Sequence, residues 1–265
     1  MIQTVKLNDE IMTWLLENRY VHLNILNHLR QHEDADILIH DSGIEQGIIV
    51  RREVDWDDTR LAFLAATTNK AFITEFWEML PEGGAFFSAA PVEFARILAE
   101  IKEPRWYGTP CKSYAVKREL FVPVKPTNPA HAVGSLSPTD AEEIEPFHPL
   151  HGDERTPEVI AERIKWIGED IAGNDTAALR VDGVLACWCL DHDDGSLGPL
   201  YTKEEFRRQG LAEIVAADLI EKQFARGLTP FVHIYENNAN SLGLAAKVRG
   251  FEFTHECVWL GMEKS

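Results

Sequence analysis

The sequence has few cysteines and no long hydrophobic run, and both features narrow the class of protein. Four cysteines in 265 residues are too few for a disulfide framework. Cys187 and Cys189 lie two apart in an apolar run and would share one face of a strand. A zinc site there needs a second Cys/His pair at ligand spacing, so buried thiols are the favoured interpretation. No apolar run approaches the roughly 20 residues of a membrane-spanning helix.

The first ten residues also lack the features of a targeting segment. They show neither the basic and apolar layout of a secretory signal nor the arginine-rich composition of a transit peptide. We therefore expect a cytoplasmic protein, with a mitochondrial location as the alternative.

Basic residues are scarce. The formal net charge is −17, which argues against nucleic acid as the main partner. The acidity is concentrated between residues 131 and 200, where fifteen acidic residues face four basic ones. One interpretation is a well-solvated surface, and the other is a field that attracts a cationic substrate.

Three prolines divide the chain. Pro123, Pro126 and Pro129 predict a linker over residues 123–132 between an N-terminal domain, 1–122, and a C-terminal domain, 133–265. The N-terminal pattern predicts a smaller α+β domain without a chemical motif, and no internal repeat or low-complexity tract is visible. Its expected helices are 11–30, 72–80 and 92–101, and its expected strands are 37–40, 47–51, 61–65 and 114–122.

The C-terminal elements come in a more informative order. Ser137 and Thr156, each followed by proline, are typical helix N-caps. Asp182-Gly183 predicts a tight hairpin, and Gly227 ends a helix. The pattern predicts strands at 133–136, 177–181, 184–190, 197–202, 231–235 and 253–262, with helices from 137, over 156–167, 210–226 and 241–248. The order β-α-α-β-β-β-α-β-α-β indicates an antiparallel meander that leads into a parallel crossover.

The junction between the strand at 197–202 and the helix at 210–226 has the composition of an anion-binding turn. The first four amides of a helix have no internal partner, and the helix dipole adds positive potential. Gly210 and the small Ala212 let a bulky anion approach the backbone. Arg207 and Arg208 add full positive charges, so the stretch from Tyr201 to Ala212 is predicted to seat a pyrophosphate. The alternative is a glycine loop that only connects the strand to the helix.

On these residues the sequence resembles the GNAT superfamily of N-acyltransferases. The family's signature, Arg/Gln-x-x-Gly-x-Gly/Ala at the start of a helix, is matched by Arg207, Gly210 and Ala212. Gly250-Phe251 resembles the end of the family's last helix. The match covers about residue 133 to the C-terminus, and it implies an α/β (α+β) GNAT fold there, after a smaller α+β domain.

A finer resemblance is to the glycine N-acyltransferase-like branch, in which a helix-and-strand domain also precedes the GNAT domain. The residues that support it are Asp182, Gly183, Cys187, Trp188, Gly195, Tyr201, Thr202, Arg207, Gly210, Leu211, Leu228, Thr229 and Pro230.

The resemblance implies a role for each matching position, with acetyl-CoA or another acyl-CoA as co-substrate and no metal. The strand before the signature pairs with the pantetheine arm and polarises the thioester carbonyl; here these residues are Leu200, Tyr201 and Thr202. The backbone that would hold the pyrophosphate is that of Arg207, Arg208, Gln209, Gly210, Leu211 and Ala212. Asn238 and Asn240 stand where the family often contacts pantetheine.

Two departures from the family bear on catalysis. The position of the tyrosine that protonates the leaving thiolate holds Ala245 or Ala246, neither of which can donate a proton. The position of the glutamate base of the glycine-acylating branch holds Ser196, which can relay a proton through water to Asp193 or Asp194.

Several other side chains are candidates with a plain structural alternative. His233 and Tyr235 share a strand face and could shuttle a proton, although a hydrogen-bonded core histidine is the commoner case. His148 and His151 could line the substrate mouth or simply be solvated. Three further groups are expected to be structural: Trp188 in the core or pocket wall, the helical stripe Leu211, Ile214, Val215 and Leu219, and Cys257, which would need a paired base to act as a nucleophile.

The missing base bears on the acceptor, because the amine must attack in its neutral form. An α-amino group with a pKa of about 8 is already roughly one-tenth neutral at pH 7, whereas a lysine-like amine with a pKa of about 10.4 is almost wholly charged. This favours an α-amino acceptor, while the acidic region favours a cationic one, and the sequence leaves both open. The leading hypothesis is acyl transfer to a small amino acid or amine. The alternatives are an acyl-CoA-binding pseudoenzyme or sensor and a protein N-terminal or lysine acetyltransferase. The sequence does not indicate the oligomeric state.

Overall fold

The structure, a computed structural model, describes residues 1–52, 60–148, 155–192 and 194–264. The chain forms two compact units. Unit 1 comprises Met1–Tyr114, His233–Ala239 and Phe253–Ser265, and unit 2 comprises Ala115–Val232 and Asn240–Glu252. The expected linker at 123–132 lies within unit 2. The division into domains at 1–122 and 133–265 stays a prediction.

Unit 1 is a sheet with helices on both faces. Its elements are β1 (Ile2–Val5), α1 (Asp9–Glu17), α2 (Leu23–Gln31), β2 (Ile37–His40), the 3₁₀ turn η1 (Ile44–Gln46), β3 (Ile48–Arg52), β4 (Arg60–Ala66), α3 (Lys70–Met79), β5 (Gly83–Pro91), α4 (Val92–Ile101) and β6 (Trp106–Tyr107). Parts of β7 (Cys111–Val116), β12 (Phe231–Tyr235) and β13 (Phe251–Lys264) complete it. The strand order is β1-β2-β3-β4-β5-β13-β7-β12, with β6 paired to β13.

The two faces of this sheet have separate cores. Ile37, Ile48 and Leu64 point toward α1 and α2, and Phe63 and Phe87 belong to the core formed with α3 and α4. Each face is closed by apolar helix residues, as expected for a sheet that is buried on both sides.

Unit 2 carries the pyrophosphate turn. Its elements are β8 (His131–Gly134), η2 (Pro138–Asp140), α5 (Ala141–Ile144), η3 (Glu145–Phe147), α6 (Pro157–Gly173), β9 (Thr176–Val181), β10 (Val184–Asp191), β11 (Leu197–Thr202), η4 (Glu204–Phe206) and α7 (Leu211–Ala225). Most of α8 (Ala239–Ala245) and the ends of β7, β12 and β13 also belong to it. Strands β8 to β11 form an antiparallel meander in the order β11-β10-β9-β8.

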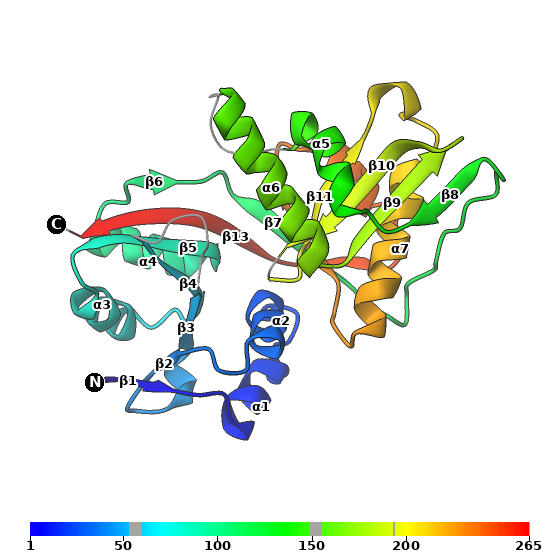
Figure 1. The fold of residues 1–265 in the computed structure, drawn as a ribbon. Coiled ribbons are helices and arrows are strands. Elements are labelled where there is room, and N and C mark those ends of the chain that lie inside the picture. The colour runs from blue at the N-terminus through cyan, green and yellow to red at the C-terminus, as the bar shows by residue number, and fades with distance from the viewer. Residues whose placement is uncertain (53–59, 149–154, 193, 265) are drawn as a thin grey trace. The chain divides into compact units, whose positions relative to one another are not determined.

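Helices α5 and α6 cover one face of this meander and α7 covers the other (Figure 1). Successive side chains of β10 point to opposite faces of the sheet. Trp188 therefore packs with α6, while Cys187 and Cys189 pack on the side of α7. The two thiols therefore share a face, as expected. All four cysteines are buried thiols.

The local signals in the C-terminal half are confirmed. The Ser137 side chain accepts from a backbone amide in a capping box, and Thr156 accepts from the Val159 amide. Asp182 and Gly183 both have positive φ, 49° and 85°, as the tight hairpin requires. The whole expected order of strands and helices in this half is present.

The N-terminal half repeats this order of elements, although no repeat is visible in the sequence. In unit 1 one strand and two helices precede the antiparallel strands β2-β3-β4; α3 then crosses to β5, which pairs parallel with β4. In unit 2 the same sequence of elements runs from β8 through α7 to β12. The chain thus contains the same layout twice, and the expectation of no internal repeat holds for the sequence but not for the topology.

Other expectations for the N-terminal half were wrong. The single helix predicted at 11–30 is two helices, because Asn18 leaves the helical region at φ −123° and His22 folds back to stack on Trp14 at 4.9 Å. The strand predicted at 114–122 ends at Val116, since the amides of Leu120 and Phe121 turn back to the Lys117 carbonyl. Strands β1, β5 and β6 were not predicted. Within the described ranges, no helix combines the length and apolar character needed to cross a bilayer.

Candidate functional site

Strand β11 has one unpaired side. Its register with β10 pairs Leu200 with Cys189, Tyr201 with Trp188 and Thr202 with Cys187. In the described part of unit 2 it is the edge strand of the meander, and Ser196, directly before it, forms an isolated parallel bridge with Phe231. The remaining outward backbone groups suit an extended ligand that pairs with the strand edge.

The turn after β11 has the geometry of an anion site. Arg208 and Gly210 both have left-handed backbone conformations, with φ of 64° and 78°. Gly210 is the N-cap of α7 and supplies no side-chain cap, so the first amides of the helix point outward without an intrahelical partner. A Cβ placed on Gly210 would meet nothing within 4 Å, so the space beside this glycine, at the start of the helix, is open.

Arg207 is fixed at the end of the strand. Its Nε donates to the Thr202 carbonyl at 3.1 Å, and Nη2 lies 3.3 Å from the Tyr201 hydroxyl. The guanidinium also lies 5.6 Å from the centre of the Tyr201 ring. The Gln209 side chain bonds back to the Glu205 carbonyl at 3.5 Å. Arg207 and Arg208 are both exposed and bring positive charge to the rim of the turn.

Aromatic side chains hold η3 against β11. The Tyr201 ring lies 4.9 Å from Phe147 and 5.2 Å from Trp188, measured between ring centroids. Trp188 is fully buried, so its expected role in the core is confirmed. This cluster anchors Phe147 to the strand predicted to hold pantetheine.

The turn before β11 places Ser196 and Asp194 together. Asp194 Oδ1 accepts from the Ser196 amide at 2.9 Å, and the Ser196 carbonyl accepts from the His192 amide at 2.9 Å. Both side chains are buried. Asp193, the other predicted end of the relay, lies outside the described residues. The carboxylate thus contacts the backbone of Ser196, and the relay through its hydroxyl stays a prediction.

Comparison with known proteins bears on this layout. Residues 179–260 match the family model described as FR47-like protein. Over 98% of both chains, the fold is similar to a Drosophila protein from a structural genomics programme, at 17% identity and a TM-score of 0.71. A GCN5-related N-acetyltransferase from Kribbella flavida is similar over 94% of this chain and 96% of its own, at 15% identity and a TM-score of 0.60.

A tandem GNAT protein from the clavulanic acid biosynthesis pathway is similar over 99% of this chain and 98% of its own, at 12% identity and a TM-score of 0.53. The chain has the GNAT fold. The mixed α/β architecture predicted from the sequence is therefore confirmed. No curated protein sequence matches the chain.

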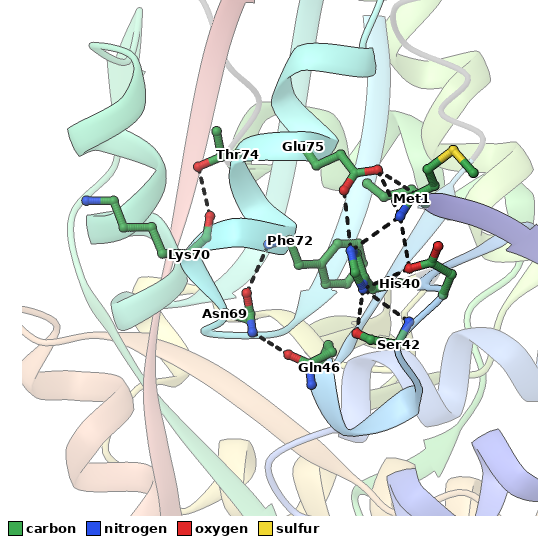
Figure 2. Close-up of polar contacts among 11 residues, drawn as sticks. Met1, His40, Ser42, Gln46, Asn69, Lys70, Phe72, Thr74 and Glu75 are labelled. Atoms are coloured by element: carbon green, nitrogen blue, oxygen red, sulfur yellow. Dashed lines mark hydrogen bonds and ion pairs between the residues drawn. The ribbon is translucent and has the colours of Figure 1, made fainter.

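Only one of the two GNAT layouts has an open turn at its crossover helix. In unit 1, α3 follows β4 as α7 follows β11, but Asn69 caps α3 by accepting from the Phe72 amide at 2.9 Å. The Asn69 side-chain amide in turn donates to the Gln46 side chain (Figure 2). No glycine stands between Ala66 and Lys70. The counterpart of the pyrophosphate turn is thus closed by side chains of unit 1.

Two buried groups near the β10–β11 turn were missed by sequence reasoning. Asp191 is 1% exposed and accepts from Gln223 Nε2 at 2.8 Å, and the same nitrogen donates to the Gly195 carbonyl at 2.9 Å. Burial, reinforced by Asp175 and Asp194 and opposed by Arg226, raises the pKa of Asp191 to about 8. The sequence did contain signals for this pair. Asp191 is an acidic residue at the end of an apolar strand, and Gln223 is a polar residue within an apolar helix.

His148 is the other group whose surroundings the sequence did not reveal. It follows η3 directly, and its ring packs edge-on against Trp166 at 5.5 Å. Burial is the main cause that lowers the pKa of His148, to about 4. Nearby Glu145 is buried and ion-paired with Arg155 at 2.8 Å. His151, predicted beside it, lies outside the described residues.

The remaining predicted site residues fall in different units. His233 and Tyr235 are in unit 1, where both rings pack on Trp259, and His233 Nδ1 lies 3.3 Å from Cys257 Sγ. Asn238 is also in unit 1, and its amide donates to the Tyr235 carbonyl at 2.9 Å.

Asn240 belongs to unit 2, within α8. Ala245 is buried at the end of the same helix and Ala246 is exposed. Across the described residues, no group of three or more His, Cys, Asp or Glu side chains is placed to hold a metal ion.

Proposed function

We propose that the protein is an acyl-CoA-dependent N-acyltransferase that moves an acetyl or longer acyl group to an amine by direct attack. The observation that carries the proposal is the uncapped turn of Arg208 and Gly210 at the start of α7, immediately after an edge strand. The free amides suit the pyrophosphate of coenzyme A, and the strand edge suits its pantetheine arm.

The chemistry follows from positioning. Pantetheine pairs along Leu200, Tyr201 and Thr202, and a backbone amide of this stretch polarises the thioester carbonyl. The pyrophosphate binds the amides from Arg207 to Ala212, with the arginines at the rim. The neutral amine attacks the carbonyl carbon, the C–N bond forms, and the C–S bond breaks to release the thiolate of coenzyme A.

The released proton needs an acceptor. Ser196 with Asp194 is one predicted path, and His233 with Tyr235 is another. Asn238 and Asn240 are the further predicted contacts of pantetheine. General-base assistance of this kind is typically worth about 10²–10⁴-fold in rate.

The favoured acceptor is a small amino acid or amine, in keeping with the resemblance to the glycine N-acyltransferase-like branch. An α-amino group reacts with little base assistance, because a sizeable fraction of it is neutral at pH 7. Acceptors with a higher pKa, such as a lysine side chain or a cationic amine drawn in by the acidic region, depend more on a base. A protein N-terminus or lysine is the alternative acceptor.

One observation favours a second candidate, an acyl-CoA-binding module without turnover. The family position of the thiolate-protonating tyrosine holds Ala245 or Ala246, which leaves no proton donor there. Such a module would bind acyl-CoA through the same turn.

Two measurements separate these functions. Binding is tested by thermal stabilisation with acetyl-CoA and longer acyl-CoAs, since a ligand at about 100 times its Kd stabilises the native state by about 2.7 kcal/mol. Turnover is tested by thiol release with a panel of amines. Stabilisation without thiol release on any amine supports the binding module, and no stabilisation by any acyl-CoA rejects both functions.

Gly210→Glu tests the site itself. The glutamate side chain extends from the open space beside Gly210 and brings a negative charge to the start of α7, so we expect stabilisation by acyl-CoA to disappear. Gly183→Glu is the matched control, because Gly183 also has a positive φ, 85°, and open space around it, but lies in the β9–β10 hairpin. A folded Gly210→Glu protein that acyl-CoA still stabilises would show that the pyrophosphate binds elsewhere.

A further inference from the structure

The His148 side chain is half-buried, and its two ring nitrogens have no polar partner among the described residues. Nδ1 and Nε2 are both shielded from solvent. One ring nitrogen of a neutral imidazole carries a proton and the other a lone pair. Leaving both unpaired inside a protein costs stability, and such a group in a native structure calls for an explanation.

The position of His148 is fixed relative to β11. Phe147, the preceding residue, stacks on Tyr201 at 4.9 Å, and Tyr201 belongs to the stretch proposed to hold pantetheine. Trp166 of α6 packs against the His148 ring itself. The imidazole is therefore held next to the strand that positions the thioester, on the face covered by α5 and α6.

A second imidazole lies over the start of the same strand. A Cβ added to Gly198 would come 3.3 Å from His192 Nε2, so the His192 ring lies over β11 at that point. The His192 amide donates to the Ser196 carbonyl. His192 also contributes to lowering the pKa of His148, so the two imidazoles lie near each other.

The charged groups around His148 favour its neutral form. Burial, His192 and Arg163 all lower its pKa, while Glu145 raises it. Glu145 is itself paired with Arg155 at 2.8 Å and lies 3.7 Å from Arg163. At neutral pH the ring thus keeps a free lone pair, which is the state that a proton acceptor requires.

Building on the proposed function, we propose that His148 receives the proton of the acceptor amine. As the amine nitrogen bonds to the thioester carbon, its positive charge develops beside the imidazole, and an N–H proton moves to the unpaired ring nitrogen. The C–S bond then breaks, the electron pair leaves with the sulfur, and His148 returns its proton to the thiolate or to water. The nitrogen that has no partner among the described residues finds one in the acceptor.

The test uses the full chain and three variants. His148→Ala removes the imidazole, His148→Gln keeps a polar side chain without a base, and His131→Gln is the control, since His131 lies in unit 2 on β8 with an exposed contact to Asn128. Thiol release is measured with acetyl-CoA and an amine that the wild type uses. Thermal stabilisation by acetyl-CoA is measured in parallel, and imidazole is added to His148→Ala.

We expect a loss of about 100-fold in kcat/KM for the amine in His148→Ala and His148→Gln, within the range of general-base assistance. Stabilisation by acetyl-CoA stays at the wild-type level, and added imidazole restores His148→Ala at least about tenfold. The restored rate rises with the neutral fraction of the added imidazole, which a purely structural histidine would not produce.

Two results overturn the assignment: variants that stay within about threefold of the wild type, or a loss of turnover that imidazole does not restore. A wild type that binds acetyl-CoA but releases no thiol with any amine rejects the transferase, and the role of His148 with it. If the wild type releases thiol but the His148 variants do not behave as expected, only the role of His148 is rejected and the transferase stands.

Discussion

The Gln223 side chain donates one hydrogen bond to Asp191 Oδ1 at 2.8 Å and another to the Gly195 carbonyl at 2.9 Å. Helix α7 is thereby tied to both the end of β10 and the turn that carries Asp194 and Ser196. The same helix begins at Gly210, so one rigid element positions the pyrophosphate turn at one end and the predicted relay at the other. This arrangement buries the Asp191 carboxyl group, and the residue is only 1% exposed.

Asp191→Asn is expected to raise the thermal stability, and to do so more at higher pH. The folded pKa of Asp191 is raised to about 8, against about 3.9 in the unfolded chain. Between these values the folded protein keeps a proton that the unfolded chain releases, so the free energy of unfolding falls as pH rises from about 4 to 8. Asparagine does not titrate and still accepts from Gln223. We expect a gain in Tm of roughly 2–4 °C at pH 8, equivalent to about 1 kcal/mol, and a smaller gain at pH 5.

Asp175→Asn is the control for this change. Asp175 pairs with the same arginine, Arg226, at 3.0 Å, but its side chain is 28% exposed. Its loss removes an ion pair without relieving a buried charge, so no stabilisation should appear. Equal gains for the two variants, or a gain for Asp191→Asn that shrinks with rising pH, would contradict the explanation by burial.

Each chain is expected to bind one acyl-CoA, although it contains the GNAT layout twice. The Asn69 side chain caps α3 by accepting from the Phe72 amide, whereas no side chain caps the start of α7. Titration calorimetry of acetyl-CoA should give one site per chain, and Gly210→Glu should remove it completely. Asn69→Ala, which lowers helix stability by about 1 kcal/mol, should leave the number of sites unchanged. Two sites per chain in the wild type, one of which persists in Gly210→Glu, would contradict this and indicate a second site.

How much of this fold the sequence predicts depends on whether the signal is local. The Asp182-Gly183 hairpin and the caps at Ser137 and Thr156 follow from single residues with strong conformational preferences, and all are present. Strand β5 has no such signal. Phe87, Ser88, Ala89 and Ala90 are buried in succession, so the strand lacks the alternation by which a half-exposed strand is identified.

Within the candidate site, too, only the features with a local sequence signal are predictable. The turn around Gly210 is predictable because the glycine, the arginines and the following helix are contiguous in sequence. The surroundings of Asp191 and His148 are not predictable, because they depend on residues distant in the chain. Gln223 contacts Asp191, and Trp166 packs on His148. The repeated topology is hidden for a related reason: unit 1 keeps the order of elements but caps α3 with an asparagine instead of a glycine turn.

Arg207→Ala should weaken acyl-CoA binding without unfolding the protein. The guanidinium is exposed and its contacts are with Thr202 and Tyr201 at the end of β11. Removing one charge-assisted contact to a phosphate is worth about 1.5–3 kcal/mol, so we expect Kd to rise roughly 10- to 100-fold. The melting temperature without ligand should change little, as for most surface substitutions.

Salt provides the control for this prediction. If Arg207 acts through its charge, the difference in Kd between the wild type and Arg207→Ala shrinks as the salt concentration rises. Arg207→Lys should recover part of the affinity, because it restores the charge without the paired geometry. A difference that is independent of salt would assign the effect to packing on Tyr201 instead.

Ser196→Ala should lower turnover less than about threefold if His148 receives the proton. The contact that orders the turn runs from the Ser196 amide to Asp194, and it survives loss of the hydroxyl. Thiol release under identical conditions is the measurement, with His148→Gln alongside. A loss beyond about tenfold in Ser196→Ala would instead assign the proton path to the serine hydroxyl and Asp194.

His148→Phe should separate stability from activity. A phenyl ring keeps the edge-on contact with Trp166 but has no buried nitrogen to leave unpaired, and each unsatisfied polar group costs about 1–3 kcal/mol. We therefore expect Tm to rise by several degrees while thiol release falls about as far as in His148→Gln. His131→Phe, at a half-exposed position on β8, should change neither quantity appreciably. A lower Tm in His148→Phe would mean that the imidazole contributes to folding, and its unpaired nitrogens would then need another explanation than the reaction.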